Sequence, residues 1–130
     1  ETPLSLVQLD NPQRAAEVLS LLQMNEGNSS GRVIGCVSWD WEGHADQVCR
    51  HHSFGNVRRR PFSKIWTDLT EALMARLKDK KTYVTGRCAR CKWLDVCAGN
   101  FRVRAEALTG DLWAPDPACY LTDEEIGVSC

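Results

Sequence analysis

The stretch GRCARCKWLDVC, residues 86–97, carries three cysteines at C-x2-C-x5-C spacing. A fourth cysteine, Cys119, follows after 21 intervening residues. Four thiolates in such a set are ligands for a soft metal centre, either an iron–sulfur cluster or a structural zinc ion. We therefore predict one metal centre around which the rest of the chain folds. Its predicted ligands are Cys88, Cys91, Cys97 and Cys119.

The spacing favours a cluster over zinc. Zinc ribbons generally use two C-x2-C pairs, because each pair offers two thiolates to a tetrahedral ion. This chain has one such pair, Cys88 and Cys91, and the C-x5-C step to Cys97 spreads the ligands more widely. Zinc remains the alternative metal.

Composition indicates one soluble globular domain in a reducing compartment. The chain has 130 residues, of which 43% are hydrophobic and 25% charged, and it has no apolar run near the roughly 18 residues that a membrane span needs. Seven cysteines are an odd number, and the opening ETPLSLVQLDNPQR has no pattern of a signal peptide. We expect a cytoplasmic protein without a disulfide framework. Because the sequence does not begin with Met, we also expect a piece of a longer chain.

Charge is unevenly distributed along the sequence. Residues 50–104 carry 14 Lys and Arg against 4 Asp and Glu, whereas the remainder carries 2 against 13. A basic middle of this size suits an anionic partner, such as a small molecule with several carboxylates, a nucleic acid or an acidic protein. The alternative is that the acidic ends fold back over the basic middle.

Hydrophobic periodicity predicts an α+β fold with a small β-hairpin and several helices. We expect helices at 12–24, 62–78 and 98–110, the first capped by Asn11 and the last ended by Gly110. Thr122 and Glu125 form a capping box that predicts a short final helix. Strands at 32–40 and 47–51, joined by a turn around Gly43, are expected to form the hairpin. We expect little regular structure at 86–97 and 111–119.

Three further segments resemble a known family. The cysteine pattern, together with FGNVRRRPFSKIW at 54–66, resembles the SPASM or twitch module that lies C-terminal to the barrel of radical SAM enzymes. The tail CAGNFRVRAEALTGDLWAPDPACYLTDEEIG, 97–127, is similar almost throughout to the end of the radical SAM proteins of heme d1 biosynthesis, the NirJ family. NSSG at 28–31 fits the same family.

The resemblance implies one [4Fe–4S] cluster on the four cysteines, auxiliary to a radical SAM barrel that acts on a tetrapyrrole. The cluster would relay an electron or help to close the substrate pocket. The barrel's own C-x3-C-x2-C pattern is absent from this sequence, so we do not expect this chain to bind S-adenosylmethionine or to be active alone. Residues 1–31 would be a helical lead-in from the end of the barrel, and residues 32–130 the auxiliary module.

The resemblance also separates the remaining cysteines from the ligands. A second auxiliary cluster would need a cysteine at the position of Phe101. Cys36 and Cys49 depart from the family's Gly-x4-Cys step, so we predict that they are not ligands. Cys130 is expected to be a free thiol.

Other side chains have predicted roles in binding or shielding. Four arginines flank the cysteines and are candidates to stabilise a negative cluster or to bind tetrapyrrole carboxylates; the alternative is a solvated basic face. They are Arg87, Arg90, Arg102 and Arg104. We expect the histidines, His44, His51 and His52, to lie at the surface. The five tryptophans, at 39, 41, 66, 93 and 113, are predicted to lie in the core or to shield the cluster.

No catalytic residue is predicted, because no acid–base pair, nucleophile motif or phosphate-binding loop is present. Two alternatives remain to the auxiliary domain. One is a non-catalytic zinc-binding module that contacts nucleic acid or an acidic protein through its basic middle. The other is a stand-alone electron-transfer partner for a separate barrel subunit. We favour a barrel partner and a tetrapyrrole over nucleic acid, and expect no membrane.

Overall fold

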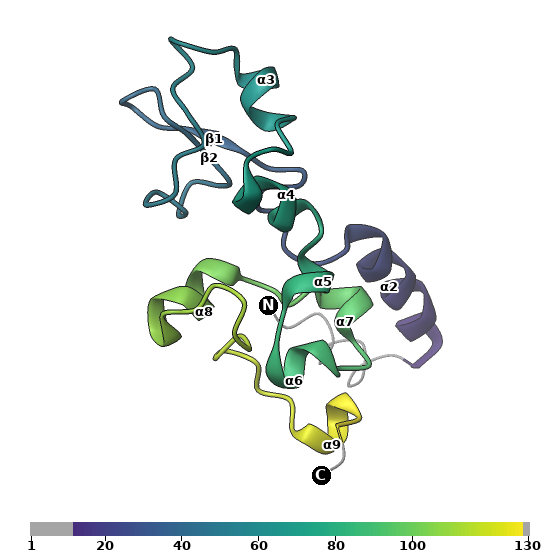
Figure 1. Ribbon diagram of the computed structural model, residues 1–130. Helices are drawn as coiled ribbons and strands as arrows, with labels where there is room; N and C mark the ends of the chain where they lie inside the picture. The colour runs from purple at the N-terminus through teal and green to yellow at the C-terminus, as the bar shows by residue number, and fades with distance from the viewer. Residues whose placement is uncertain (1–11, 129–130) are drawn as a thin grey trace.

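The computed structural model describes residues 12–128, which form an elongated α+β arrangement with a short hairpin at one end. The predicted fold class is confirmed. The elements, in chain order, are α2 (Pro12–Asn25), β1 (Cys36–Val37), β2 (Gly43–His44), α3 (Phe62–Trp66), α4 (Ala72–Lys78), α5 (Lys80–Tyr83), α6 (Gly86–Ala89), α7 (Leu94–Cys97), α8 (Arg102–Thr109) and α9 (Asp123–Ile126). In Figure 1 the hairpin and α3 occupy the top, α6 and α9 lie at the opposite end, and α2 packs beside α7.

Three helix predictions are confirmed. Helix α2 spans Pro12–Asn25, close to the predicted 12–24; its predicted cap, Asn11, lies outside the described residues. Helix α8 spans Arg102–Thr109 and is capped by Gly110, which adopts a left-handed conformation with φ of 76°. Its predicted start at 98 is wrong, because residues 98–100 have positive φ. Helix α9 begins with the complete capping box of Thr122 and Glu125. Within the described residues, no helix is long and apolar enough to span a bilayer.

The hairpin forms at a different place from the one predicted. Strands β1 and β2 pair antiparallel, with Val37 opposite Gly43, so the second strand is not at 47–51 and Gly43 is not in the turn. The Asp46 carboxylate accepts hydrogen bonds from the backbone N–H groups of Val48 and Cys49, both at 2.8 Å. This side-chain turn uses donors that a strand at 47–51 would need. The prediction that Cys36 and Cys49 lie on the two hairpin arms is therefore wrong for Cys49.

The predicted helix at 62–78 is two helices, α3 and α4. Between them the Asp68 side chain accepts hydrogen bonds from both the backbone N–H and the hydroxyl of Thr70. Glu71 then caps α4 by accepting a bond from the N–H of Met74 at 2.6 Å. Because Asp and Thr side chains satisfy the backbone locally, the helix stops although the apolar period continues through Leu69, which is exposed.

Two apolar clusters hold the molecule together. The first comprises Ala45, Cys49 and Leu77, with Phe54, Leu73, Val103 and Trp113 packed around them, and joins the hairpin end to α8. The second comprises Leu121, Ile126 and Val128, with Cys91, Trp93 and Cys119 against them. The core prediction is wrong for two tryptophans, since Trp39 is 83% exposed and Trp41 is 45% exposed.

Candidate metal centre

Short helical turns, not an irregular loop, carry the first three cysteines. Cys88 lies in α6 and Cys97 is the last residue of α7. Between them the backbone N–H of Cys91 donates to the carbonyl of Cys88 at 3.2 Å, and the N–H of Leu94 donates to the carbonyl of Cys91 at 3.0 Å. These linked turns hold the backbone segments that carry the three cysteines close together.

The chain reverses immediately after Cys97. Ala98, Gly99 and Asn100 all have positive φ, of 48°, 75° and 55°, and the N–H of Asn100 donates to the Cys97 carbonyl at 2.7 Å. A left-handed backbone conformation is unfavourable for residues other than glycine. Ala98 and Asn100 therefore make this turn a strained part of the fold. It directs α8 away from the cysteines.

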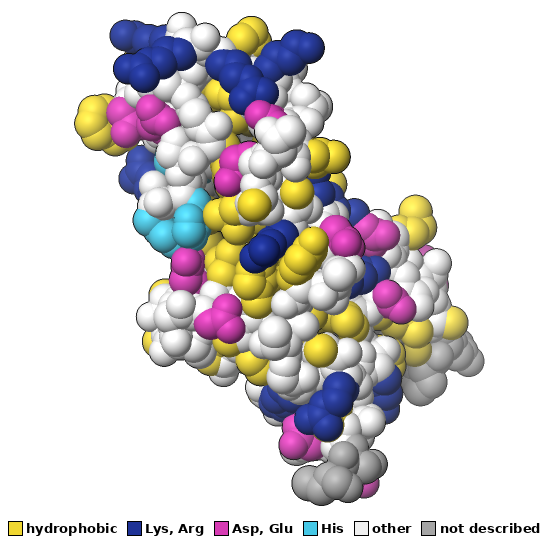
Figure 2. All heavy atoms as spheres, viewed as in Figure 1, with side chains coloured by type: hydrophobic (Ala, Val, Ile, Leu, Met, Phe, Trp, Pro, Cys, Tyr) yellow, Lys and Arg dark blue, Asp and Glu magenta, His cyan; other side chains and the backbone are white. Residues whose placement is uncertain are grey.

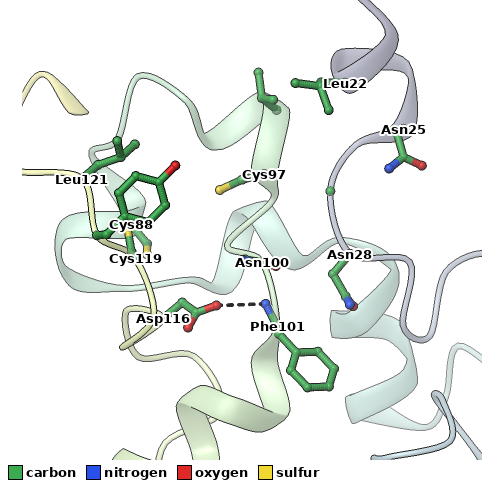
Figure 3. A pocket seen from close by; sticks show the side chains of 13 residues that line it. Leu22, Asn25, Asn28, Cys88, Cys97, Asn100, Phe101, Asp116, Cys119 and Leu121 are labelled. Carbon is green, nitrogen blue, oxygen red and sulfur yellow. Dashed lines mark hydrogen bonds between the residues drawn. The ribbon is translucent and has the colours of Figure 1, made fainter. Parts of the chain in front are cut away.

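Asp116 positions the segment of the chain that carries the fourth cysteine, Cys119. Its buried carboxylate accepts hydrogen bonds from the N–H of Phe101 at 3.2 Å and of Ala118 at 3.0 Å, and its carbonyl accepts from the N–H of Cys119 at 3.0 Å. Figure 3 shows the bond to Phe101, which joins the chain just after Cys97 to the chain just before Cys119. No pattern in the sequence points to this role, because aspartate in a Pro-rich segment is an ordinary turn residue.

A cavity of about 410 Å³ opens onto the cysteines. Cys88, Cys97 and Cys119 line it, with Leu22 of α2 and Asn28 on the other side (Figure 3). Cys91 packs against the second apolar cluster beside Cys119. The structure therefore brings the four predicted ligands together from three separate parts of the chain.

Cys91 and Cys97 lie in surroundings that make deprotonation of their thiols unfavourable. Burial raises the pKa of Cys97 to about 11, and neighbouring Cys91, Cys88 and Cys119 add to the effect. Burial also raises the pKa of Cys91, although the backbone N–H of Trp93 donates to its sulfur at 3.3 Å. Four neighbouring thiolates are thus unfavourable without a cationic centre to bind them, which is the usual coupling between metal binding and thiol deprotonation.

The four predicted arginines have different environments. Arg102 is 1% exposed and donates to the carbonyls of Gly99, Leu112 and Ala114. Arg104 binds the Asp116 carboxylate with two nitrogens, at 2.8 and 2.7 Å. Arg87 donates to the Leu121 carbonyl and pairs with Asp123 at 3.0 Å, while Arg90 is exposed. The first three thus fasten the chain around the cysteines, and substrate binding by these arginines stays a prediction.

Two of these arginines also have a buried side-chain N–H group without a hydrogen-bond acceptor. In the described part of the chain, the buried side-chain N–H groups without a hydrogen-bond partner are Nε of Arg87 and Nε of Arg102. Arg87 acts electrostatically on Cys91, and Arg102 interacts with Cys88 and Cys97. Orphaned buried donors are rare, and two cationic ones beside four thiols fit a negatively charged cluster.

Other candidate residues lie away from this centre. Cys49 is 2% exposed in the hairpin core, where burial raises its pKa to about 12, and Cys36 pairs with His44 in the hairpin. The prediction of a surface position is wrong for His44, which is 4% exposed and bonds to Ser38 Oγ and the His52 carbonyl. Cys130 lies outside the described residues.

Comparison with protein families gives a match over residues 28–92 to SPASM, an iron–sulfur cluster-binding domain. The matched region is half of the chain and includes Cys88 and Cys91. It ends before Cys97 and Cys119, so the match supports the cluster-binding class without fixing all four ligands.

Curated relatives extend the similarity over nearly the whole chain. Fe-coproporphyrin III synthase of Methanosarcina barkeri is 69% identical over 121 residues, which are 91% of this chain and 30% of that protein. Pre-heme d1 synthase of Dinoroseobacter shibae is 41% identical over 118 residues, 88% of this chain and 29% of that protein. PqqA peptide cyclase of Rhizobium meliloti is 34% identical over 90 residues, 69% of this chain and 21% of that protein. The chain thus spans less than a third of the length of these relatives, and no solved structure matches it.

Proposed function

This chain belongs to the SPASM family of iron–sulfur cluster-binding domains, and from that premise we propose that it holds one auxiliary [4Fe–4S] cluster of a radical SAM enzyme acting on a heme-type tetrapyrrole. The ligands in this proposal are Cys88, Cys91, Cys97 and Cys119. The observation that carries it is the gathering of these four cysteines, three of them lining one cavity and Cys91 packed beside Cys119.

The chain's own residues would prepare the site in three ways. Trp93 and Leu121 cover the Cys91 and Cys119 side with apolar surface, which keeps water from the sulfurs. Asp116 fixes the return of the chain to Cys119. Arg87 and Arg102 place buried donors and positive charge near the cysteine set, which would stabilise a more negative oxidation state. When bound, the cluster would supply a one-electron redox centre.

A tetrapyrrole substrate is supported by two relatives, one named Fe-coproporphyrin III synthase and the other pre-heme d1 synthase. Substrates of this class carry several carboxylates, which suit arginine donors. Of the four predicted arginines, Arg90 has an exposed side chain, and we retain the substrate-binding prediction for it first. PqqA peptide cyclase shows that related domains also serve an enzyme named for a peptide substrate.

The catalytic partner in this proposal is a radical SAM barrel, in the same parent chain or in a separate subunit, within the reducing cytoplasm. We assign residues 1–31 to the lead-in from that barrel and residues 32–130 to the auxiliary module. Leu22 and Asn28 of the lead-in line the cavity, so the lead-in would carry the contact between barrel and cluster.

The test is anaerobic reconstitution followed by iron, sulfide and zinc analysis. We expect about four irons and four sulfides per chain and broad absorbance near 400 nm. Cys88→Ala should lose this cluster, whereas Cys36→Ala, a matched cysteine in the hairpin, should keep it. One zinc without sulfide, or equal iron loss in both variants, would refute the assignment.

A further inference from the structure

His51, His52 and Glu106 form a compact, partly exposed group, and none of them lines the cysteine cavity. Nε2 of His51 lies 2.6 Å from Glu106 Oε2, and Nε2 of His52 lies 2.9 and 3.1 Å from the two carboxylate oxygens. One ligand atom from each residue lies within 4.8 Å of the others. The centroids of the two imidazole rings are 4.2 Å apart. Each ring directs its Nε2 atom to the Glu106 carboxylate. Figure 2 shows histidine gathered beside acidic side chains at the edge of this face.

Both halves of the group are fixed by the surrounding fold. The His52 carbonyl bonds at 2.9 Å to Nδ1 of His44, a buried ring whose Nε2 lies 2.9 Å from Ser38 Oγ. Glu106 lies in α8, which is fastened by the buried Arg102. The three ligands therefore come from segments that other hydrogen bonds hold in place, which reduces the ordering that a metal ion would have to impose.

The carboxylate of this group is paired with histidine alone. Among the described residues, the ion pairs of Glu106 are with the two imidazoles, so no Lys or Arg side chain occupies its oxygens.

We propose that His51, His52 and Glu106 form a second metal site, separate from the cysteines, for Zn²⁺ or a similar borderline divalent ion. Two imidazole nitrogens and one carboxylate oxygen are the ligand set that such ions prefer, whereas Mg²⁺ and Ca²⁺ prefer oxygens alone. Each imidazole would bind through Nε2 with its proton on Nδ1. The His51 side chain is 52% exposed, which leaves the fourth position open to water.

Metal at this site would cross-link two segments that are 54 residues apart in the sequence. One segment follows the hairpin, and the other is the helix that leads from Cys97 toward Cys119. The ion would therefore stabilise the position of α8 relative to the hairpin end, as a structural site does.

The experiment is zinc titration by calorimetry of the full chain with its cysteines occupied by reconstituted cluster. We expect one zinc ion per chain beyond the cluster iron. Glu106→Gln and His52→Gln should each weaken binding at least about tenfold, which is about 1.4 kcal/mol. Glu124→Gln, an exposed glutamate on α9, should bind zinc as the unmodified chain does.

Zinc X-ray absorption of the unmodified chain gives a second readout that does not depend on how the variants fold. The proposal expects a first shell of nitrogen and oxygen at about 2.0–2.2 Å. A sulfur shell at about 2.3 Å would place the ion on cysteines and overturn the proposal. It would also be overturned by an absence of zinc binding to the unmodified chain, or by variants that bind as tightly as it does.

Discussion

Arg102 is the most deeply buried charged side chain beside the cysteines. Its guanidinium reaches three backbone carbonyls, on Gly99, Leu112 and Ala114, and so joins the turn after Cys97 to the segment that returns to Cys119. Burial lowers the pKa of Arg102, while Cys88, Asp116 and Cys97 act in the opposite direction. A positive charge in this place is therefore tolerated because acceptors and negative groups surround it.

We predict that Arg102→Gln destabilises the cluster-loaded chain by about 2–4 kcal/mol, because a shorter neutral side chain leaves buried carbonyls without their donors. The free energy of unfolding from urea titration measures this change. Arg90→Gln, at an exposed arginine two residues after Cys88, should change the same free energy by less than about 0.5 kcal/mol. Equal effects from the two substitutions would show that Arg102 has no special role.

Gly27 shows how closely the lead-in approaches the cysteine turns. A Cβ atom at this position would lie 2.1 Å from the carbonyl oxygen of Cys97, and the residue has φ of 72°. Both the space and the backbone conformation therefore require glycine. Gly110 has a similar φ of 76°, but a Cβ there would meet nothing within 4 Å.

This pair of glycines provides a matched prediction. Gly110→Ala should cost only the left-handed conformation, about 1–2 kcal/mol. Gly27→Ala should cost more and should also lower the iron retained per chain, because the backbone of a predicted ligand must move. Unfolding in urea and iron analysis after gel filtration measure the two effects. If Gly27→Ala retained iron and stability as Gly110→Ala does, the close approach would not matter to the site.

At the scale of the elements, the sequence predicted those whose signals are local. The capping box of α9 and the glycine that ends α8 were correct because a few adjacent residues determine them. The hairpin was displaced because Asp46 takes up the amides at 48 and 49. The 62–78 helix was interrupted because Asp68 bonds to Thr70. In both places the hydrogen bonds of an Asp side chain determine the backbone conformation, and the hydrophobic periodicity does not.

The same distinction holds for the candidate sites. The spacing of the cysteines along the sequence predicts which four thiols lie near one another in the structure. It could not predict the group of His51, His52 and Glu106, because folding brings together residues 54 positions apart. Nor could it show that Trp39 is exposed, since aromatic residues in a strand pattern usually face a core.

Asp68 gives a prediction about the turn between α3 and α4. Hydrogen bonds from Thr70, followed by the bond from Arg60, lower the pKa of Asp68 to about 2. The folded value is below the ordinary 3.8, so its stabilising contribution is present above about pH 4 and is lost as the pH falls toward 2.

Carboxyl NMR titration should give this value directly. Arg60→Gln should raise the pKa of Asp68, since Arg60 Nη1 lies 2.7 Å from its carboxylate. Arg59→Gln, at the exposed neighbouring arginine, should leave the pKa unchanged. An Asp68 that titrated at its ordinary value in the unmodified chain would contradict the turn described here.

Across the whole molecule, the two ends depend on different interactions. The hairpin end has paired strands, and its apolar cluster extends to α8. The cysteine end consists of single-turn helices, α6, α7 and α9, which are too short to be stable by themselves. Metal binding and folding are therefore expected to be coupled at the cysteine end.

We predict that iron chelation makes the two ends respond differently in hydrogen exchange. The amides of Cys91, Leu94 and Cys97, bonded within the cysteine turns, should lose protection because the cluster no longer fixes them. The amides of Ser38 and Gly43, bonded within the hairpin region, should keep theirs. Equal loss at both ends would show one cooperative unit, and no loss at either would show that the fold does not need its cluster.

The seating of the lead-in against Cys97 also bears on the oxygen tolerance of any shortened version of the domain. Leu22, Asn25 and Asn28 form one wall of the cavity onto which three of the cysteines open. A chain trimmed to residues 32–130 would keep every cysteine and lose that wall. Dioxygen would then reach the sulfurs from a side that α2 and the residues after it cover in the longer chain. We therefore expect residues 1–31, which contain no cysteine, to limit the access of air to the sulfurs.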